Sequence, residues 1–505
     1  MKKLLLFSII GLALSFTSCK DDDSDHIYVQ DAALEGLTAT SISFDKDGGE
    51  ETFSVKCAVM PSAKSDVEWV IVNRIGSANN LHTFSVTASA NTLAEVRTGH
   101  VTISSGKNNE TVTVTQEAAP ATSDPVEDPV QPSLGIKALD IAKDIRAGWN
   151  IGNTLEACDN VAKKAAETLW GNPKINEAYV AGIKAAGFNA VRIPCAWDYY
   201  IIDENNTIDP SWLDRVNEVV GYVLDQDMYA ILNIHWDGGW LENNIGSSVD
   251  EKLLEKQSAL WSQIASRLGH YDERLMFAGL NEPNASNQSQ TNTLLEYEQA
   301  FIDAVRASDG NNKTRTLIFQ GPTTDINNTN NFFKVNPTDP SGEGYLMAEI
   351  HYYDPSDYTI MGNDGDWSQY VKFFWGKDYH LEGSNRNVSW GEEDHMQSQF
   401  RKMKTKFVDK GIPVIIGEFG AYPEEHVNNL NSADKEIIKE NIELVRQGRA
   451  HFYNCVLKYG KENGLIPFVW DTGELISRSN GNIPESKQYI IDTIMEAAGS
   501  VSSPY

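Results

Sequence analysis

The sequence contains little cysteine, five residues in 505, and these five follow no paired spacing. Metal-binding cysteines come in closely spaced pairs, so the pattern predicts no metal site built from thiolates. We expect Cys57, Cys158, Cys195 and Cys455 to be buried free thiols with at most one bridge among them. The disulfide state of Cys158, Cys195 and Cys455 stays open at this stage.

Basic residues are also scarce, because 42 Lys and Arg stand against 71 Asp and Glu, a formal net charge of −29. This excess of negative charge repels nucleic acids and anionic membrane surfaces, so neither is an expected partner. A neutral polymer is not repelled. With 41% hydrophobic and 10% aromatic residues, most of the chain is expected to be globular, with a large core and an accessory module.

The apolar run at the N-terminus is too short to span a membrane. It extends from Leu4 to Leu14 after a basic start, and small residues precede Cys19, so residues 1–18 are predicted to be a secretory signal peptide. Cys19 in this place resembles the bacterial lipobox, and the following Lys20-Asp21-Asp22-Asp23 resembles the acidic export signal of Bacteroidetes surface lipoproteins. The resemblance implies a palmitate-type lipid on Cys19, a tether over residues 19–34 and anchorage in the outer membrane at the cell surface. The alternative is an ordinary residue in a cleaved leader.

Residues 35–117 are expected to form a small immunoglobulin-like β-sandwich. Five segments alternate apolar and polar residues between glycine-containing turns, namely 41–44, 52–55, 83–86, 100–103 and 111–115. The order of Asp47-Gly48-Gly49, Val67-Glu68-Trp69-Val70 and Arg97-Thr98-Gly99 resembles a BACON domain. Such a domain implies either glycan binding or a spacer, and we favour the spacer because no cluster of exposed aromatic residues is evident. Residues 118–135, rich in proline and acidic residues, are predicted to be a linker.

From residue 136 to residue 505, strand-like runs alternate with helical periodicity. Eight such units predict an α/β fold, the (β/α)₈ TIM barrel, with long loops on one face. A doubly wound sheet would need a Gly-rich phosphate turn, which is absent. The expected strands are 147–152, 189–194, 229–236, 275–282, 315–321, 345–353, 413–418 and 465–471, and the clearest helices are 176–187, 212–224, 251–268, 294–307 and 435–459. The connection after Gly321 carries little helical signal.

Polar and ionisable residues stand at the ends of the predicted strands. In a (β/α)₈ barrel the active site lies at the carboxyl ends of the strands, so these side chains are expected to converge. Two strands end in glutamate, at Asn281-Glu282-Pro283 and at Gly417-Glu418-Phe419. One such glutamate is usually a solvated loop residue, whereas two on one barrel indicate the carboxyl pair of a glycosidase. The other strand ends carry Arg192, His235, His351, Tyr353 and Trp470.

Residues 136 to about 500 resemble glycoside hydrolase family 5. The segments Gly148-Trp149-Asn150-Ile151-Gly152-Asn153-Thr154 and Trp170-Gly171-Asn172-Pro173 are similar to its subfamily 4, which contains endo-glucanases and xyloglucanases. The resemblance implies a retaining enzyme with Glu282 as acid/base and Glu418 as nucleophile. Trp236 stands where a number of family members have a second histidine. Substrate-binding or supporting roles are implied for Arg192, His235, Asn281, His351, Tyr353, Trp470, Asn153, Trp170 and Trp236.

The chemistry of retention requires two carboxyl groups about 5–5.5 Å apart. Glu418 must be ionised to attack the anomeric carbon, so we expect Arg192 and Tyr353 to hold its pKa down. Glu282 must start protonated, which repulsion from an ionised Glu418 favours. Asn281 is expected to bond the sugar 2-hydroxyl, and Trp470 to offer a flat apolar face to the sugar beside the cleavage point.

Several of these residues have a purely structural alternative. His235 and His351 could be supports that only orient other groups. Trp170, Trp236, Trp240 and Trp375 could each be a core residue or a sugar platform, and those in loops are the better platform candidates.

The family resemblance and the lipoprotein-like leader together imply a surface-tethered, monomeric endo-β-1,4-glucanase that acts on xyloglucan. No metal or organic cofactor is expected, because the two carboxyl groups supply the acid, base and nucleophile. Cellulose and mixed-linkage glucan are the next candidate polymers, followed by mannan and xylan. A rival of another class is a non-catalytic surface glycan-binding lipoprotein built on a degenerate barrel. The intact pair of Glu282 and Glu418 argues against this rival.

Overall fold

The computed structural model describes residues 31–118, 135–422 and 431–501, except residues 68 and 92–94. The chain separates into two compact units, residues 1–128 and 129–505, and the division falls inside the predicted linker. The predicted signal peptide, Cys19 and most of the linker lie outside the described residues. In the part of the chain that is described, no helix is long and apolar enough to cross a membrane.

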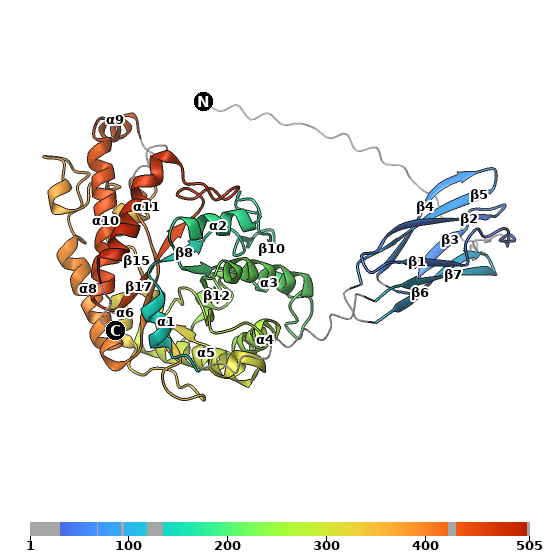
Figure 1. The fold of residues 1–505 in the computed structure, drawn as a ribbon, viewed down its shortest axis with the longest axis horizontal. Coiled ribbons are helices and arrows are strands. Elements are labelled where there is room, and N and C mark those ends of the chain that lie inside the picture. Colours follow the sequence, from blue (N-terminus) through green and yellow to red (C-terminus); the bar gives the residue numbers. More distant parts are fainter. Residues whose placement is uncertain (1–30, 68, 92–94, 119–134, 423–430, 502–505) are drawn as a thin grey trace, which may run out of the picture. The chain divides into compact units, whose positions relative to one another are not determined.

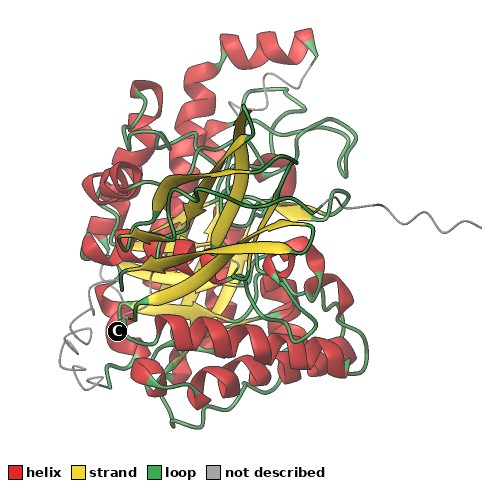
Figure 2. Cartoon of the chain, turned by 90° about the vertical axis from the view of Figure 1, so that its right-hand side faces the viewer, coloured by secondary structure: helices red, strands yellow, loops and turns green. Residues whose placement is uncertain are grey.

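The first unit is a β-sandwich with strand orders β1-β7-β6-β3 and β2-β5-β4 in its two sheets. Its inward side chains form one core that includes Phe53, Phe84 and Val101. None of its described residues is helical, so every helix in Figure 2 comes from the second unit. The strands are β1 (Ser41–Phe44), β2 (Gly49–Lys56), β3 (Ser62–Ser65), β4 (Val70–Ala78), β5 (Leu81–Ala88), β6 (Arg97–Ser105) and β7 (Asn108–Gln116).

The five strands expected from alternation are all present, and two further strands were not predicted. Strand β3 consists of Ser, Ala and Lys, and β4 is exposed along most of its length. Neither strand therefore has the alternation of buried apolar and exposed polar residues by which strands are found in a sequence. The prediction of a small sandwich is confirmed.

The second unit is a closed barrel of eight parallel strands with helices around it (Figure 1). The order around the barrel follows the chain, as the predicted βα repetition requires. Seven strands lie inside their predicted limits, and β16 extends one residue beyond. The strands are β8 (Gly148–Ile151), β11 (Ala190–Ile193), β12 (Tyr229–Asn233), β13 (Leu275–Ala278), β14 (Leu317–Gln320), β15 (Leu346–Tyr352), β16 (Val414–Phe419) and β17 (Leu465–Asp471).

Each barrel strand is followed by at least one helix, including the connection after Gly321, where the sequence carries little helical signal. Helix α6 there has seven residues and begins where the Asp325 side chain accepts the N–H of Asn328. Only Ile326 and Thr329 of this helix are buried, too few for a visible period. The helices are α1 (Ala138–Asp144), α2 (Glu177–Ala185), α3 (Pro210–Asp225), α4 (Glu251–Leu268), α5 (Gln288–Ala307), α6 (Ile326–Phe332), α7 (Ser356–Thr359), α8 (Glu393–Lys406), α9 (Ser432–Glu440), α10 (Ile442–Glu462) and α11 (Gln488–Ser500).

One helix prediction needs correction, and several helices were not predicted. The helix expected over residues 435–459 is divided into α9 and α10 at Asn441, and α1, α7, α8 and α11 were not among the helices named from the sequence. The cysteine prediction, in contrast, is confirmed, because Cys57, Cys158, Cys195 and Cys455 are all buried free thiols.

The interior of the barrel changes from apolar to polar along several of its strands. Near the amino ends it is filled by apolar side chains such as Ile231 and Ile318, and helix α1 packs against this layer. Two residues further on, the same strands point Asn233 and Gln320 inward, both buried. The polar layer therefore lies toward the carboxyl ends, where the candidate site is expected.

Candidate active site

The two predicted glutamates lie together at the carboxyl end of the barrel. One oxygen of Glu282, one of Glu418 and a ring nitrogen of His351 lie within 4.8 Å of one another. This spacing suits a retaining pair, since inverting pairs stand about 6.5–9.5 Å apart. The Glu418 side chain is 8% exposed and that of Glu282 is 45% exposed, because Glu418 lies within β16 and Glu282 follows the end of β13. The pair is thus one buried and one half-exposed carboxyl group.

Glu418 is held by donors on both of its oxygens. Arg192 Nη1 donates to Oε1 at 2.9 Å, and the Tyr353 hydroxyl donates to Oε2 at 3.1 Å. Burial nevertheless raises the pKa of Glu418, against the lowering effects of His351 and Arg192. The expectation that Arg192 and Tyr353 would hold this pKa down is therefore wrong in its net direction. The predicted contacts are present, but the loss of water outweighs them.

Arg192 links four polar side chains under the mouth of the barrel. Besides Glu418, it donates to Asn150 Oδ1 at 3.0 Å and to Asn281 Oδ1 at 2.8 Å, and its Nε lies 3.0 Å from Glu349 Oε1. The bond to Arg192 occupies the carbonyl oxygen of Asn281. The NH₂ group of Asn281 is therefore the one left to donate to a ligand.

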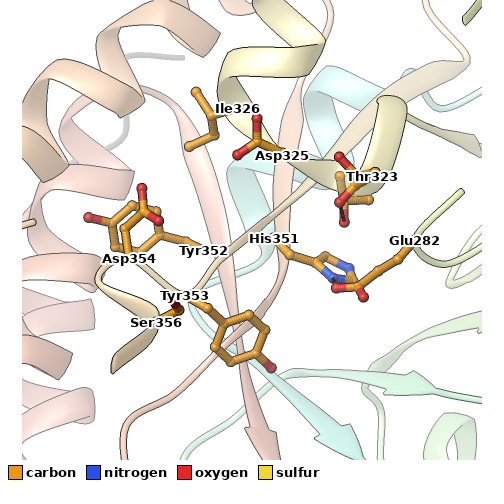
Figure 3. Close-up of a pocket in the computed structure, with 10 residues that line it drawn as sticks. Glu282, Thr323, Asp325, Ile326, His351, Tyr352, Tyr353, Asp354 and Ser356 are labelled. Atoms are coloured by element: carbon orange, nitrogen blue, oxygen red, sulfur yellow. Dashed lines mark hydrogen bonds and ion pairs between the residues drawn. The ribbon is translucent and has the colours of Figure 1, made fainter. Parts of the chain in front are cut away.

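His351 bridges two carboxyl groups and is shown beside Glu282 in Figure 3. Its Nδ1 lies 2.7 Å from Glu282 Oε1, and its Nε2 lies 3.3 Å from Glu349 Oε1. Burial would lower the pKa of His351, but Glu418, Glu282 and Glu349 together raise it to about 10. The ring is therefore charged near neutral pH and donates through both nitrogens.

Glu349 is a buried carboxylate that the sequence analysis missed. Burial opposes its charge, but Arg192 and His351 outweigh burial and lower the pKa of Glu349. A Cβ on Gly417 would lie 1.9 Å from Glu349 Oε1, so only glycine fits beside it. The signal was present in the sequence, since Glu349 precedes His351 and Tyr353 at intervals of two on one strand.

These charges balance around the carboxyl pair. Arg192 and His351 carry two positive charges against the carboxylates of Glu349 and Glu418, so the cluster is neutral when Glu282 holds a proton. Glu282, His351 and Glu418 are ligand types that could hold a metal. Both ring nitrogens of His351, however, are already engaged, by Glu282 and by Glu349, so this histidine presents no free nitrogen to a metal ion.

Glu242, in a short 3₁₀ helix (Glu242–Asn244), is a second residue that was missed. Its buried carboxyl group accepts the backbone N–H of Glu282, and its carbonyl oxygen accepts the N–H of Asn284 at 3.1 Å. Burial raises the pKa of Glu242 to about 8, and the charge of Glu282 adds to this effect. The residue fixes the turn that carries Glu282. It lies in an aperiodic loop, where no local pattern marks it.

Three other predicted residues line the mouth or support it. Trp470 stacks on His235 with ring centroids 5.7 Å apart, and burial and the charge of Arg192 lower the pKa of His235, so this ring is neutral. Asn153 has a left-handed φ of 60°, and the buried Glu156 carboxyl group accepts its backbone N–H. Contacts thus join eight of the predicted residues around one mouth, namely Arg192, His235, Asn281, Glu282, His351, Tyr353, Glu418 and Trp470.

The four tryptophans considered as sugar platforms fall into two classes. Trp170 is 42% exposed and Trp236 is partly exposed, so both side chains reach solvent. Trp240 and Trp375 are buried, which makes them core residues.

Comparison with known families agrees with this geometry. The family model described as cellulase (glycosyl hydrolase family 5) matches residues 155–474, and the BACON family model matches residues 60–117. Endoglucanase A of Paenibacillus barcinonensis is 34% identical over 72% of this chain and 90% of its own length. The xyloglucan-specific endo-beta-1,4-glucanase BoGH5A of Bacteroides ovatus is 31% identical over 95% of this chain and 94% of its own.

Solved structures show the same relationship. A Bacteroides ovatus GH5 xyloglucanase in complex with a XXXG heptasaccharide matches with a TM-score of 0.64 and 30% identity, covering 92% of this chain and all of that chain. A family 5 xyloglucanase from Paenibacillus pabuli matches with a TM-score of 0.61 and 33% identity, covering 71% of this chain and 99% of its own. The chain belongs to glycosyl hydrolase family 5.

Proposed function

We propose that the protein is an endo-β-1,4-glucanase that cleaves xyloglucan by double displacement, with Glu418 as nucleophile and Glu282 as acid/base. The observation that carries the proposal is the carboxyl pair, with oxygens within 4.8 Å at the carboxyl end of a family 5 barrel. The choice of xyloglucan is supported by relatives named for this polymer, one of which matches 95% of the chain.

In the first displacement, Glu418 attacks the anomeric carbon and the glycosidic bond to the leaving oxygen breaks. Arg192 and Tyr353 hold both carboxylate oxygens, which aims the nucleophile. The proton of Glu282 passes to the leaving oxygen. Charged His351 then stabilises the carboxylate that remains on Glu282.

In the second displacement, Glu282 takes a proton from water, and the oxygen of that water attacks the anomeric carbon of the glycosyl–Glu418 ester. The ester bond breaks and Glu418 returns as a carboxylate, with retention overall. Asn281, with its carbonyl oxygen held by Arg192, donates from its NH₂ group to the sugar 2-hydroxyl in both transition states.

A hydrolysis panel tests the proposal. Xyloglucan, mixed-linkage β-glucan, carboxymethyl cellulose and glucomannan are incubated with the protein, and reducing ends and product lengths are measured. The expected result is the highest kcat/KM on xyloglucan, with oligosaccharides as early products. Preference for another β-glucan would overturn the assigned polymer. Binding without any release of reducing ends would instead identify a non-catalytic surface glycan-binding protein.

The variant Glu242→Gln should keep near-normal kcat at pH 6, because its amide oxygen can still accept the N–H of Glu282. Glu242→Ala leaves that N–H without its acceptor and should lose kcat about tenfold, with less change in KM. The pKa of Glu242 rises from 4.5 to about 8 on folding, so the folded protein keeps a proton that the unfolded chain releases in this window. The free energy of unfolding of the wild type therefore decreases as the pH rises from 4.5 toward 8. The Tm of Glu242→Gln relative to that of the wild type should increase over the same range. Equal kcat for the two variants would contradict a positioning role.

Deleting residues 35–117 should leave kcat on soluble xyloglucan unchanged within error. The sandwich has its own hydrophobic core, and all residues of the proposed mechanism come from the barrel unit. The measurement is initial rate on soluble polymer for the full chain and the deletion variant at matched concentration. A large fall in kcat would show that the sandwich takes part in catalysis, contrary to a spacer function.

We also propose that Cys19 is lipidated and anchors the protein in the outer membrane at the cell surface. The support is the leader of residues 1–18, the small residues before Cys19 and the acidic run after it. Cys19→Ala should move the protein from the membrane fraction to the soluble fraction of cells. Membrane retention of this variant would refute the lipid anchor.

A further inference from the structure

Gln320 is a fully buried glutamine at the carboxyl end of β14 that the mechanism above does not use. Its amide oxygen accepts the backbone N–H of Leu280 at 2.7 Å, and its NH₂ group donates to Glu349 Oε2 at 2.5 Å. The opposite orientation of the amide would place NH₂ against the N–H of Leu280 and oxygen against a carboxylate. The two partners therefore fix the orientation of the Gln320 amide.

These two bonds close a chain of contacts that contains Glu282. Glu349 Oε1 lies 3.3 Å from His351 Nε2, and His351 Nδ1 lies 2.7 Å from Glu282 Oε1. Glu282 follows Leu280 by two residues, so the chain of contacts returns to the backbone that Gln320 holds. We call Leu280, Gln320, Glu349, His351 and Glu282 the Gln320 network. Within it, the carboxyl group of Glu282 is fixed both from its own backbone and from its side-chain partner.

Helix α5 holds the main chain of Gln320. Oε1 of Glu298, a fully buried residue of this helix, accepts the N–H of Gln320 at 2.8 Å. Burial raises the pKa of Glu298 well above its ordinary value, and the charge of Glu349 adds to this effect, so Glu298 is neutral. A Cβ on Gly279 would lie 2.6 Å from Glu298 Oε2, which shows how closely α5 packs on β13. Both the main chain and the side chain of Gln320 are therefore held in place.

The nucleophile is held mainly by contacts outside the Gln320 network. Glu418 accepts from Arg192 and from Tyr353. Arg192 Nε also lies 3.0 Å from Glu349 Oε1, but Nη1 and Nη2 of this guanidinium donate to other side chains, so its position does not depend on Glu349 alone. A change at Gln320 should therefore disturb the acid/base more than the nucleophile.

We propose that Gln320 is a positioning residue for Glu282, and that it acts through the backbone of Leu280 and through Glu349 and His351. The inference rests on the proposed function, because it takes Glu282 to be the acid/base. A neutral amide suits this place, since it offers one acceptor and one donor, whereas a carboxylate could accept from Leu280 but could not donate to Glu349. Because Gln320 is fully buried, its effect must pass through these neighbours.

The first test compares two substrates with Gln320→Met, which keeps an unbranched side chain but removes both side-chain bonds. The leaving oxygen of xyloglucan needs a proton from Glu282, whereas an activated aryl β-glycoside of a cello-oligosaccharide needs none. The value of kcat/KM should fall about tenfold on xyloglucan and less than about twofold on the aryl glycoside. A general loss of folded protein would instead lower both values by the same factor.

The second test uses Gln320→Glu at a series of pH values. The introduced carboxyl group would be faced by Glu298 and Glu349, and burial together with the charge of Glu349 would raise its pKa. Below that pKa the neutral acid can accept from Leu280 and donate its proton to Glu349, as the amide does. Above it, the carboxylate cannot donate and repels Glu349. The ratio of variant to wild-type kcat/KM on xyloglucan should therefore be near one at acid pH and fall as the pH rises.

Gln257→Met is the matched control. Gln257 is a fully buried glutamine on α4 whose Nε2 donates to the carbonyl oxygen of Gly279 at 3.1 Å, so it also supports β13. It makes no hydrogen bond to Glu349 in the described structure. Its replacement should lower Tm about as much as Gln320→Met does, but kcat/KM should stay near the wild-type value on both substrates.

Three results would overturn the inference. One is an equal loss, or no loss, on the two substrates with Gln320→Met, and another is the same selective loss with Gln257→Met. The third is a Gln320→Glu ratio that stays constant with pH, which decides the matter even where Gln320→Met does not fold. If the wild-type protein cleaves xyloglucan in these experiments, the proposed function stands and only the role of Gln320 fails. A wild-type protein that cleaves no xyloglucan would overturn the proposed function itself.

Discussion

The variant Glu418→Ala is expected to lose hydrolysis of xyloglucan by on the order of 10⁵-fold in kcat, while binding of oligosaccharide stays measurable. Arg192 and Tyr353 each donate a hydrogen bond to Glu418 and so orient its carboxylate. Among the described residues of the cluster, no other carboxylate accepts from both donors. Binding is expected to survive because Asn281, His235 and Trp470, which are at the same mouth, are unchanged in this variant. Initial rates of reducing-end release, with calorimetric titration of the variant, measure both quantities.

Azide separates the loss of a nucleophile from a general loss of structure. In Glu418→Ala, azide enters from the vacated face, displaces an activated aryl leaving group and forms an α-glycosyl azide with inversion. The control is Glu255→Ala on the exposed side of α4, which should keep wild-type kcat. Near-normal hydrolysis by Glu418→Ala would refute the nucleophile assignment.

Much of the site can be predicted from the sequence, because a barrel converts strand ends into neighbours. Arg192, His351 and Glu418 are far apart in the chain, yet each stands at or near the end of a short apolar run. The closed barrel order then brings them to one edge. The same logic could have found Glu349, since it shares the inward face of β15 with His351.

Functional residues in loops cannot be predicted from the positions of strand ends. Glu242 reaches Glu282 from a turn 40 residues earlier in the chain, a contact set by how two loops fold over the barrel. Helix α6 begins with an Asp325 cap rather than an apolar stripe, and it follows the strained Thr323 and Thr324. These features depend on packing, so neither periodicity nor motif reports them.

The pKa of Glu418 is a second property that the sequence does not predict. Sequence identifies Arg192 and Tyr353 as partners but cannot tell how completely the carboxylate is removed from water. The structure buries Glu418, and burial raises its pKa against those partners. Sequence reasoning gave His351 too small a role, because its charge opposes the effect of burial on the pKa of Glu418 and the ring also contacts Glu282.

The variant Glu282→Gln is expected to lower kcat on xyloglucan about 10³-fold, but to spare the first displacement on a substrate with an activated aryl leaving group. Such a group leaves without a proton, so the glycosyl–enzyme forms and then lacks a base to activate water. The amide oxygen can still accept the bond from His351, so the site keeps its geometry. Rapid-mixing kinetics should record a burst of one aryl alcohol per active site before a slow steady state.

Azide gives the sharpest contrast between the two glutamates. In Glu282→Gln it needs no general base, so it should attack the glycosyl–Glu418 ester, restore turnover and yield a β-glycosyl azide. The same reagent yields the α-anomer with Glu418→Ala, because only one displacement then occurs. A misfolded or weakened site would not give opposite anomers in the two variants. Opposite anomers would therefore assign different roles to two carboxyl groups whose oxygens lie within 4.8 Å. Finding the α-anomer with Glu282→Gln would exchange the two roles, and finding no burst would remove Glu282 from the acid/base role.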